Sequence, residues 1–151
     1  MNTIKQLEFL QSMATTRRYS QTKMIIEENI LEHSAFVGVT SVMLASEYNH
    51  LQEGQIDAKL ADLGQIALRS LFHDMEEGKT GDITRDVKYS SPEATRAFEK
   101  IAEEGIKRVL SELELSTKTE ELIYGIWKHA KDDFDGLFVK LADAAAVTFK
   151  L

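Results

Sequence analysis

The sequence predicts an all-α protein, a single compact bundle of about six helices that spans residues 1–151. Apolar residues recur with the three- and four-residue spacing of amphipathic helices, and the sequence lacks the strict alternation that is typical of strands. With one proline and eight glycines, the chain has few residues that interrupt helices. It has no cysteine, so disulfides and thiolate metal ligands are excluded.

The helix boundaries follow from this spacing and from capping residues. The polar stretch 15–28 is expected to be a loop, and Asn29 is a suitable N-cap for the helix after it. Ser91 followed by Pro92 is the clearest helix start, because proline at the first helical position lacks only an N–H that has no partner there. The segment 78–89 is expected to be a second loop. The predicted helices cover approximately 3–15, 30–48, 57–75, 92–113, 118–131 and 135–151.

Composition restricts the classes of function. The net charge of −7 argues against a broad surface for the phosphate backbone of nucleic acids. It is compatible with one small anionic ligand, because local positive charge can occur in an acidic protein. The first residues lack the basic region and apolar run of a signal peptide, and no segment approaches the roughly 20 apolar residues of a membrane span. We therefore expect a cytoplasmic protein that binds neither nucleic acid polymers nor membranes.

Two histidines and two aspartates stand out as candidate metal ligands. His33 lies on an otherwise apolar face of the second predicted helix, and His73-Asp74 lies at the end of the third. Asp143 lies in the last helix, where the residues one turn away are valines and offer no basic partner. A buried ionised carboxylate is unfavourable unless it is paired or bound to a metal. One shared divalent cation would satisfy all four side chains, and mixed nitrogen and oxygen ligands suit Mn, Fe, Co, Ni or Zn.

Each of these residues also has an ordinary interpretation. A single histidine on an apolar helix face is more often a hydrogen-bonded core residue, and an aspartate in an alanine-rich helix can simply face solvent. An isolated His-Asp dipeptide carries little information. The combination of these residues, in this order on three helices, is much more specific than any one of them.

This combination resembles the HD superfamily of metal-dependent phosphohydrolases, which is named for the adjacent His-Asp pair. Within that superfamily the sequence is similar to the bacterial 5′-deoxynucleotidases, which remove phosphate from deoxynucleoside monophosphates. A related viral group hydrolyses dATP to deoxyadenosine and triphosphate. The resemblance extends from about residue 18 to the C-terminus and rests on Arg18-Tyr19, Glu32-His33-Ser34, His73-Asp74 with Glu77, Thr80-Gly81-Asp82, Val87-Lys88-Tyr89 and Lys140 to Asp143.

The resemblance implies an HD-domain fold and a catalytic centre with one divalent transition-metal ion. The ion would be held by the two histidines and two aspartates described above, His33, His73, Asp74 and Asp143. Glu77 lies one helical turn from His73 and would orient or deprotonate a metal-bound water that attacks the phosphate.

The resemblance also implies a set of substrate contacts. Arg18 and Lys88 would bind the phosphate, and Asp82 would contact the sugar or the attacking water. Tyr19 would lie against the sugar and base, in a position where the family typically has the larger tryptophan. Lys79 adds a further cation near the proposed site.

Three interpretations of the function stay open at this point. Release of phosphate from deoxynucleoside monophosphates is the first reading, and a dNTP triphosphohydrolase is a close second, because Lys79 and Arg85 add more cations than one phosphate requires. A catalytically silent HD fold that binds a nucleotide or a protein is the alternative of another class. A dinucleotide phosphodiesterase is disfavoured, because the remaining histidines do not suit a second metal. We also expect a homo-oligomer.

Overall fold

A computed structural model of the chain describes residues 3–18 and 27–148. These residues contain helices and connecting segments but no strand, with a single antiparallel bridge between Arg17 and Asn29. The all-α prediction is therefore confirmed. The longer helices are α1 (Thr3–Thr15), α2 (Ile30–Leu51), α3 (Leu63–Phe72), α6 (Pro92–Glu112), α7 (Thr117–Lys128) and α8 (Asp133–Thr148).

The predicted capping residues start the helices as expected. Asn29 and Glu32 form a reciprocal capping box at α2, in which each side chain accepts a hydrogen bond from the backbone N–H of the other residue. The Ser91 side chain accepts from the backbone N–H of Ala94 at α6, with Pro92 in the first turn. Local sequence therefore fixes where the two longest helices begin.

The third predicted helix, 57–75, was wrong at both ends. Asp57 has a positive φ of 65°, which ends any helical geometry there, and Asn49 on α2 holds residue Ala61 through two hydrogen bonds to its backbone. Helix α3 therefore begins only at Leu63 and ends at Phe72, so that His73 and Asp74 lie in the turn that follows. The predicted loop 78–89 also contains two single-turn helices, α4 (Glu77–Thr80) and α5 (Arg85–Lys88).

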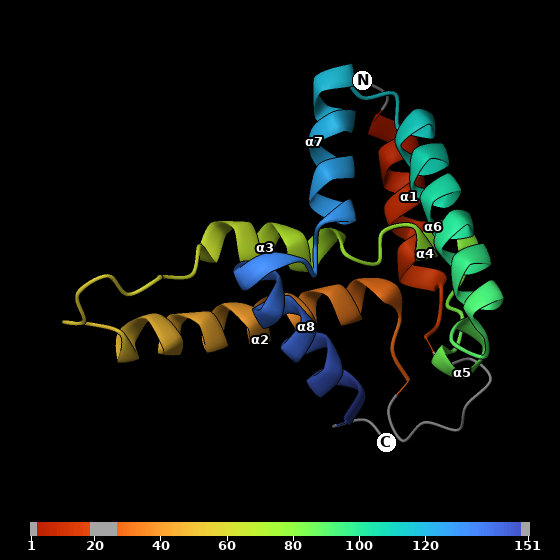
Figure 1. The fold of residues 1–151 in the computed structure, drawn as a ribbon. Coiled ribbons are helices and arrows are strands. Elements are labelled where there is room, and N and C mark those ends of the chain that lie inside the picture. Colours follow the sequence, from red (N-terminus) through yellow and green to blue (C-terminus); the bar gives the residue numbers. More distant parts are fainter. Residues whose placement is uncertain (1–2, 19–26, 149–151) are drawn as a thin grey trace.

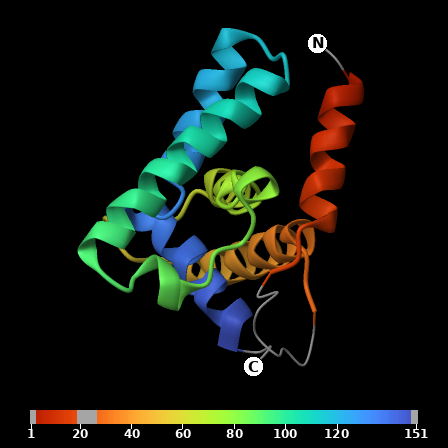
Figure 2. The same cartoon turned by 90° about the vertical axis from the view of Figure 1, so that its right-hand side faces the viewer.

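The helices form two groups, each around its own apolar cluster. Helix α2 packs against α3 and α8, around buried residues that include Val37 and Val139 (Figure 1). The second cluster, which includes Ile106 and Val109 of α6, lies between that helix, α1 and α7. Figure 2 shows α1 on one side and α6 with α7 on the other, and the short α4 contacts both α1 and α6. The turn after α3 connects the two groups, which places His73 and Asp74 at their junction.

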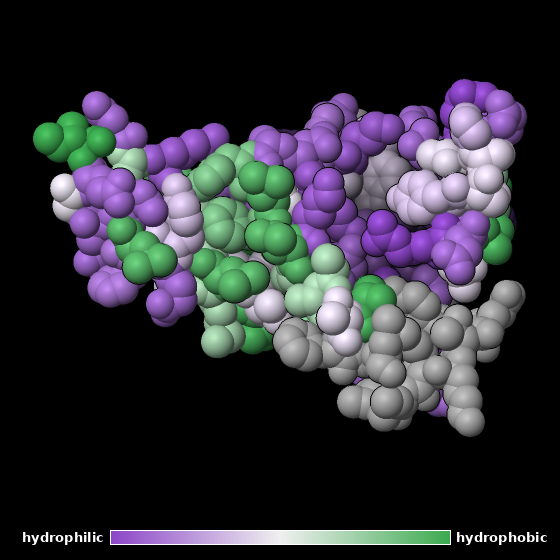
Figure 3. Space-filling view, turned by 60° about the horizontal axis from the view of Figure 1, so that its bottom comes forward, coloured by the Kyte–Doolittle hydropathy of each residue, from purple (hydrophilic) through white to green (hydrophobic). Residues whose placement is uncertain are grey.

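One face of the molecule carries an apolar patch. Figure 3 shows apolar side chains gathered near the middle of the face formed by α2 and α8. Exposed apolar residues on these helices include Val39, Met43, Leu137 and Leu141. Among the residues that the structure describes, no helix is long and apolar enough to cross a membrane.

Candidate metal centre and substrate cavity

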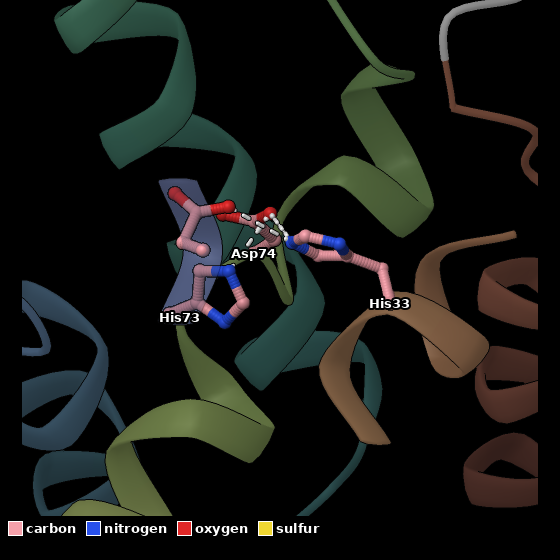
Figure 4. A group of neighbouring side chains, drawn as sticks. His33, His73 and Asp74 are labelled. Carbon is pink, nitrogen blue, oxygen red and sulfur yellow. Dashed lines mark ion pairs between the residues drawn. The ribbon is translucent and has the colours of Figure 1, made fainter. Parts of the chain in front are cut away.

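The four predicted metal ligands lie together. One donor atom from each of His33, His73, Asp74 and Asp143 can be chosen so that all lie within 4.8 Å of one another. The side chains come from the first turn of α2, the turn after α3, and the middle of α8. In Figure 4 the rings of His33 and His73 approach Asp74 from different elements. The helical packing thus brings together residues that are up to 110 positions apart in the chain.

The distances between these atoms suit a shared cation. His33 Nε2 lies 3.1 Å from Asp143 Oδ1 and 3.5 Å from Asp74 Oδ2. His73 Nε2 lies 3.1 Å from the same Asp74 oxygen. Both Nε2 atoms are buried, and neither has a hydrogen-bond partner of good geometry. Unsatisfied buried nitrogens are unfavourable, so this arrangement calls for a ligand between them.

The other ring nitrogens explain why the two Nε2 atoms are suitable metal donors. His73 Nδ1 lies 2.8 Å from the backbone oxygen of Ser70, which can only accept a hydrogen bond, so Nδ1 carries the proton. His33 Nδ1 lies 3.2 Å from Glu28 Oε2, a carboxylate oxygen that also accepts. With Nδ1 protonated, Nε2 of each ring is the nitrogen that would offer its lone pair to a cation held with the aspartates. Histidine ligands are typically oriented in this way. The residues present therefore fit a divalent cation.

Two cations neutralise the aspartates. Arg18 Nη1 donates to Asp74 Oδ2 and lies 3.4 Å from Glu77 Oε2. Lys131 Nζ donates to Asp143 Oδ2 at 2.6 Å. We expected no basic partner for Asp143 from the residues one turn away on its own helix. Its basic partner, Lys131, comes instead from the turn between α7 and α8.

These contacts determine the ionisation of the two aspartates. Burial alone raises the pKa of Asp74, but the adjacent histidine and two nearby cations hold that pKa well below its usual range. Burial likewise raises the pKa of Asp143, whereas its contacts with His33 and Lys131 lower the pKa below its ordinary value. Both aspartates are therefore ionised at neutral pH, as ligands of a cation must be.

The two glutamates after Asp74 have the opposite electrostatic environment. Burial and the charge of Asp74 raise the pKa of Glu77 well above its ordinary value. The same causes raise the pKa of Glu76 to about 7, although its Oε2 accepts a hydrogen bond from Trp127 Nε1 at 2.6 Å. Glu77 therefore has a raised proton affinity beside the metal cluster, which suits a general base.

Two of the predicted substrate residues, Arg18 and Lys88, lie at one small cavity together with the predicted catalytic residues Glu77 and Asp82. This cavity of about 80 Å³ lies against Asp74 and Asp143, and its lining includes Arg18, Glu77, Asp82, Arg85, Lys88 and Lys131. A larger cavity of about 870 Å³ adjoins it on the His73 side and shares Asp74, Lys88, Tyr89 and Lys131 with it.

Lys79 and Tyr19 are the other two predicted substrate residues. The structure does not bring Lys79 to the small cavity, because Nζ of Lys79 lies 2.6 Å from Glu112 Oε2 and the residue lines a separate hollow between α1 and α6. The expectation for Lys79 is therefore withdrawn. Tyr19 lies outside the described residues.

Comparison with known proteins identifies the family. The sequence matches the YfbR-like 5′-deoxynucleotidase family over residues 5–150. The chain belongs to this family. It is 31% identical over 144 residues to the 5′-deoxynucleotidase YfbR of Shigella boydii, an alignment that covers 93% of this chain and 68% of that protein. It is 30% identical over 141 residues to a 5′-deoxynucleotidase of Vibrio cholerae, which covers 93% of this chain and 70% of that protein.

The fold of this YfbR-like chain is also found among solved structures. It superposes on the crystal structure of an HD-domain phosphohydrolase from Listeria innocua with a TM-score of 0.78, at 20% sequence identity. The superposition covers 99% of this chain and 68% of the other. The predicted HD-domain fold is thereby confirmed.

Sequence reasoning missed three residues of this YfbR-like site. Glu28, which orients His33, lies in a segment predicted only as a polar loop. Trp127, which donates to Glu76, was not among the candidate site residues. Lys131 was not singled out at all, although it contacts a predicted metal ligand. For Glu28 a signal existed, since a carboxylate five residues before a candidate histidine ligand is a possible partner for its ring.

Proposed function

We propose that this protein is a metal-dependent phosphohydrolase that releases phosphate from 2′-deoxynucleoside 5′-monophosphates. Membership of the YfbR-like 5′-deoxynucleotidase family and the similarity to the named 5′-deoxynucleotidases support the substrate class. The pair of buried Nε2 atoms of His33 and His73, both directed at ionised aspartates and both without a hydrogen-bond partner, is the observation that carries the proposal.

The proposed ligands of the cation are His33, His73, Asp74 and Asp143, and its identity among Mn, Fe, Co, Ni and Zn is left to experiment. The chemistry that a divalent cation supplies, when bound, is to withdraw charge from phosphoryl oxygens and to increase the acidity of water. Four side chains thus serve to place positive charge beside the substrate cavity.

The remaining residues of the cavity bind and orient the reactants. Glu77 accepts the proton of the attacking water, a role that its raised pKa favours. Arg18 and Lys88 bind the phosphate oxygens, the arginine with a planar donor group and the lysine as a point charge. Asp82 lines the same cavity and contacts the sugar or the water.

A second candidate function is hydrolysis of dNTPs with release of triphosphate. The observation that favours it is the number of cations in the small cavity, where Arg85 and Lys131 accompany Arg18 and Lys88. Four cationic side chains are more than one phosphate needs, although Arg18 and Lys131 also pair with Asp74 and Asp143.

One panel of assays tests these functions. The purified protein is incubated with dNMPs, NMPs and dNTPs, in the presence of Mn²⁺, Co²⁺, Zn²⁺ or EDTA. Phosphate, pyrophosphate and triphosphate are then separated. We expect metal-dependent release of phosphate from dNMPs, whereas triphosphate from dNTPs would favour the second candidate. No release from any nucleotide with any metal would contradict both functions and favour a silent nucleotide- or protein-binding module.

We further propose that the protein is a homo-oligomer. The exposed apolar residues on α2 and α8, which include Val39, Met43 and Leu141, support this proposal, because such patches often mark interfaces (Figure 3). Light scattering at micromolar concentration tests it, and a mass equal to one chain would contradict it.

A further inference from the structure

Lys131 occupies a special position beside the proposed metal centre. It lies in the turn between α7 and α8 and lines both the small cavity and the larger one next to it. Its side chain is 36% exposed and lines both cavities, while its ammonium group contacts Asp143. The motifs that carry the family resemblance include Arg18 and Lys88 but not Lys131. The resemblance therefore assigns Lys131 no role in binding phosphate.

The backbone of this turn is held firmly in place. A Cβ atom at Gly136 would lie 2.5 Å from the backbone carbon of Lys131, so only glycine permits this close approach of α8 to the turn. The backbone N–H of Gly136 donates to the oxygen of Asp132 at 3.1 Å and also to Asp133 Oδ1 at 3.1 Å. Lys131 is therefore presented from a fixed backbone and not from a free surface loop.

The two oxygens of Asp143 have different partners. Oδ1 lies 3.1 Å from His33 Nε2, inside the ligand cluster, whereas Oδ2 accepts from Lys131 at 2.6 Å. A single carboxylate group thus separates the ammonium from the proposed ion. An anion in the small cavity, whose lining includes both Asp143 and Lys131, would lie near the ammonium group.

The lysine retains hydrogen-bonding capacity in this arrangement. An ammonium group has three N–H donors, and one of them is directed at Asp143. The residue lines the small cavity together with Arg18 and Lys88, which are proposed to bind phosphate. A phosphate oxygen in this cavity could therefore accept a charge-assisted hydrogen bond from Lys131 while its contact with Asp143 is kept.

We propose that Lys131 is a third phosphate-binding residue of the site, which holds Asp143 with one N–H and contacts a phosphate oxygen of the substrate with another. The proposal rests on the proposed function for the nature of the substrate. The alternative role is that of a counter-ion, which only compensates the charge of Asp143. A counter-ion would affect metal binding and stability but not the affinity of the metal-loaded protein for phosphate.

Calorimetric titration of the metal-loaded protein with inorganic phosphate separates these roles. The variants are Lys131→Met, Lys131→Arg and, as a matched control, Lys128→Met. Lys128 lies in the same region and lines the larger cavity, but it pairs with Glu103. Each protein is first titrated with Mn²⁺, and its circular dichroism and thermal transition are recorded so that folding is known.

We expect Lys131→Met to bind Mn²⁺ as tightly as the wild type or more tightly, because a positive charge next to the ion has been removed. We expect its affinity for phosphate to fall by about 10- to 100-fold, the effect of losing a hydrogen bond from a charged group. Lys131→Arg should restore most of this affinity, and Lys128→Met should match the wild type.

Other outcomes overturn the proposal. Phosphate affinity of Lys131→Met within about twofold of the wild type would leave only the counter-ion role. A parallel loss of Mn²⁺ affinity would mean that Lys131 acts by positioning Asp143, and absence of phosphate binding by the wild type would also contradict the proposal. Because phosphate binding is measured without turnover, the result stands apart from the nucleotide assays. Lysine-dependent phosphate binding with no dNMP hydrolysis would contradict the proposed function and leave this inference intact.

Discussion

The ligand cluster and the phosphate cavity lie side by side but are built by different kinds of structure. His33 and Asp143 project from long helices whose neighbouring residues, Val37 and Ala142, are fully buried in the apolar cluster of α2, α3 and α8. The cavity instead takes Lys88 from a four-residue helix and Lys131 from a turn. Long helices thus supply two of the four proposed ligands, the turn after α3 supplies His73 and Asp74, and the cations that are proposed to bind the substrate come from shorter segments. Substrate preference can therefore change in the cavity while the metal chemistry is kept, a common division in enzymes.

The largest effect is expected from removal of a residue of the ligand cluster. We expect His73→Ala to abolish binding of the cation and turnover together, because no other described residue supplies a donor at that position. The loss of rate should exceed the roughly 10²- to 10³-fold effect of removing one electrostatic donor. Calorimetric titration with Mn²⁺ and assays of phosphate release from dNMPs measure both effects, and excess EDTA should reproduce them in the wild type.

The matched control for this variant is His50→Ala. His50 has a side chain that is 70% exposed and pairs with Glu53 near the end of α2, far along the helix from His33. This variant should retain metal and activity. Full activity of His73→Ala without bound metal would be incompatible with the proposed mechanism.

A substitution in the small cavity should leave metal binding unchanged. We expect Glu77→Gln to bind Mn²⁺ normally and to lose rate by about 10²- to 10⁴-fold, because an amide cannot accept the proton of the attacking water. The control is Glu76→Gln, because Glu76 accepts a hydrogen bond from Trp127 and does not line the small cavity. The loss of rate in this control should be much smaller. If Glu77→Gln instead lost the metal, Glu77 would be a ligand and the two regions would not be separate.

The helices show how far the sequence could predict the fold, because some of their boundaries depend on local signals and others on contacts between distant residues. Helical spacing and the caps at Asn29 and Ser91 are local signals, and the helices that depend on them were predicted well. The helix predicted over 57–62 was wrong because Asn49 holds Ala61 through a contact across 12 residues, whereas the local signal for a later start, the N-cap Asp62, was overlooked.

The site shows the same limit. His33 and Asp143 were predicted because such residues among apolar neighbours on a helix need a chemical reason to be there, and His73-Asp74 because it completes the combination; the structure brings all four together. Lys131 was missed because the search for a partner of Asp143 considered only residues one turn away on its own helix. A partner from another element becomes visible only when the packing of helices is known.

Within the ligand cluster itself, the two histidines differ in what orients them. His73 Nδ1 faces the backbone oxygen of Ser70, which no side-chain substitution removes, whereas His33 Nδ1 depends on Glu28. We expect Glu28→Gln to weaken Mn²⁺ binding by about 10- to 100-fold, the usual effect of losing a partner of a histidine ligand. The control is Glu27→Gln, because Glu27 is exposed and pairs with Arg17 at the surface. Equal Mn²⁺ affinity of the two variants would exclude an orienting role for Glu28.

The smallest effect is expected where the turn that carries Lys131 joins α8. The two carboxylate oxygens of Asp133 accept from Arg69 Nη1 and Nη2 at 2.7 and 3.0 Å, and this pairing lowers the pKa of Asp133 from 3.8 to about 2. Because the pKa is lower in the folded state, the ion pair stabilises the fold above about pH 4, and this contribution disappears as the pH falls toward 2.

We therefore expect Asp133→Asn to lower the free energy of unfolding by only about 0.2–1 kcal/mol near pH 7, since the Asp133 side chain is 54% exposed and solvent screens its charge. Urea unfolding of both proteins at a series of pH values measures the difference. The difference should shrink as the pH is lowered below about 4, over the range in which the native protein still unfolds cooperatively. A difference that stays constant with pH would contradict this prediction, because the charge of Asp133 would then contribute nothing, while the asparagine oxygen can still accept the hydrogen bond from Gly136.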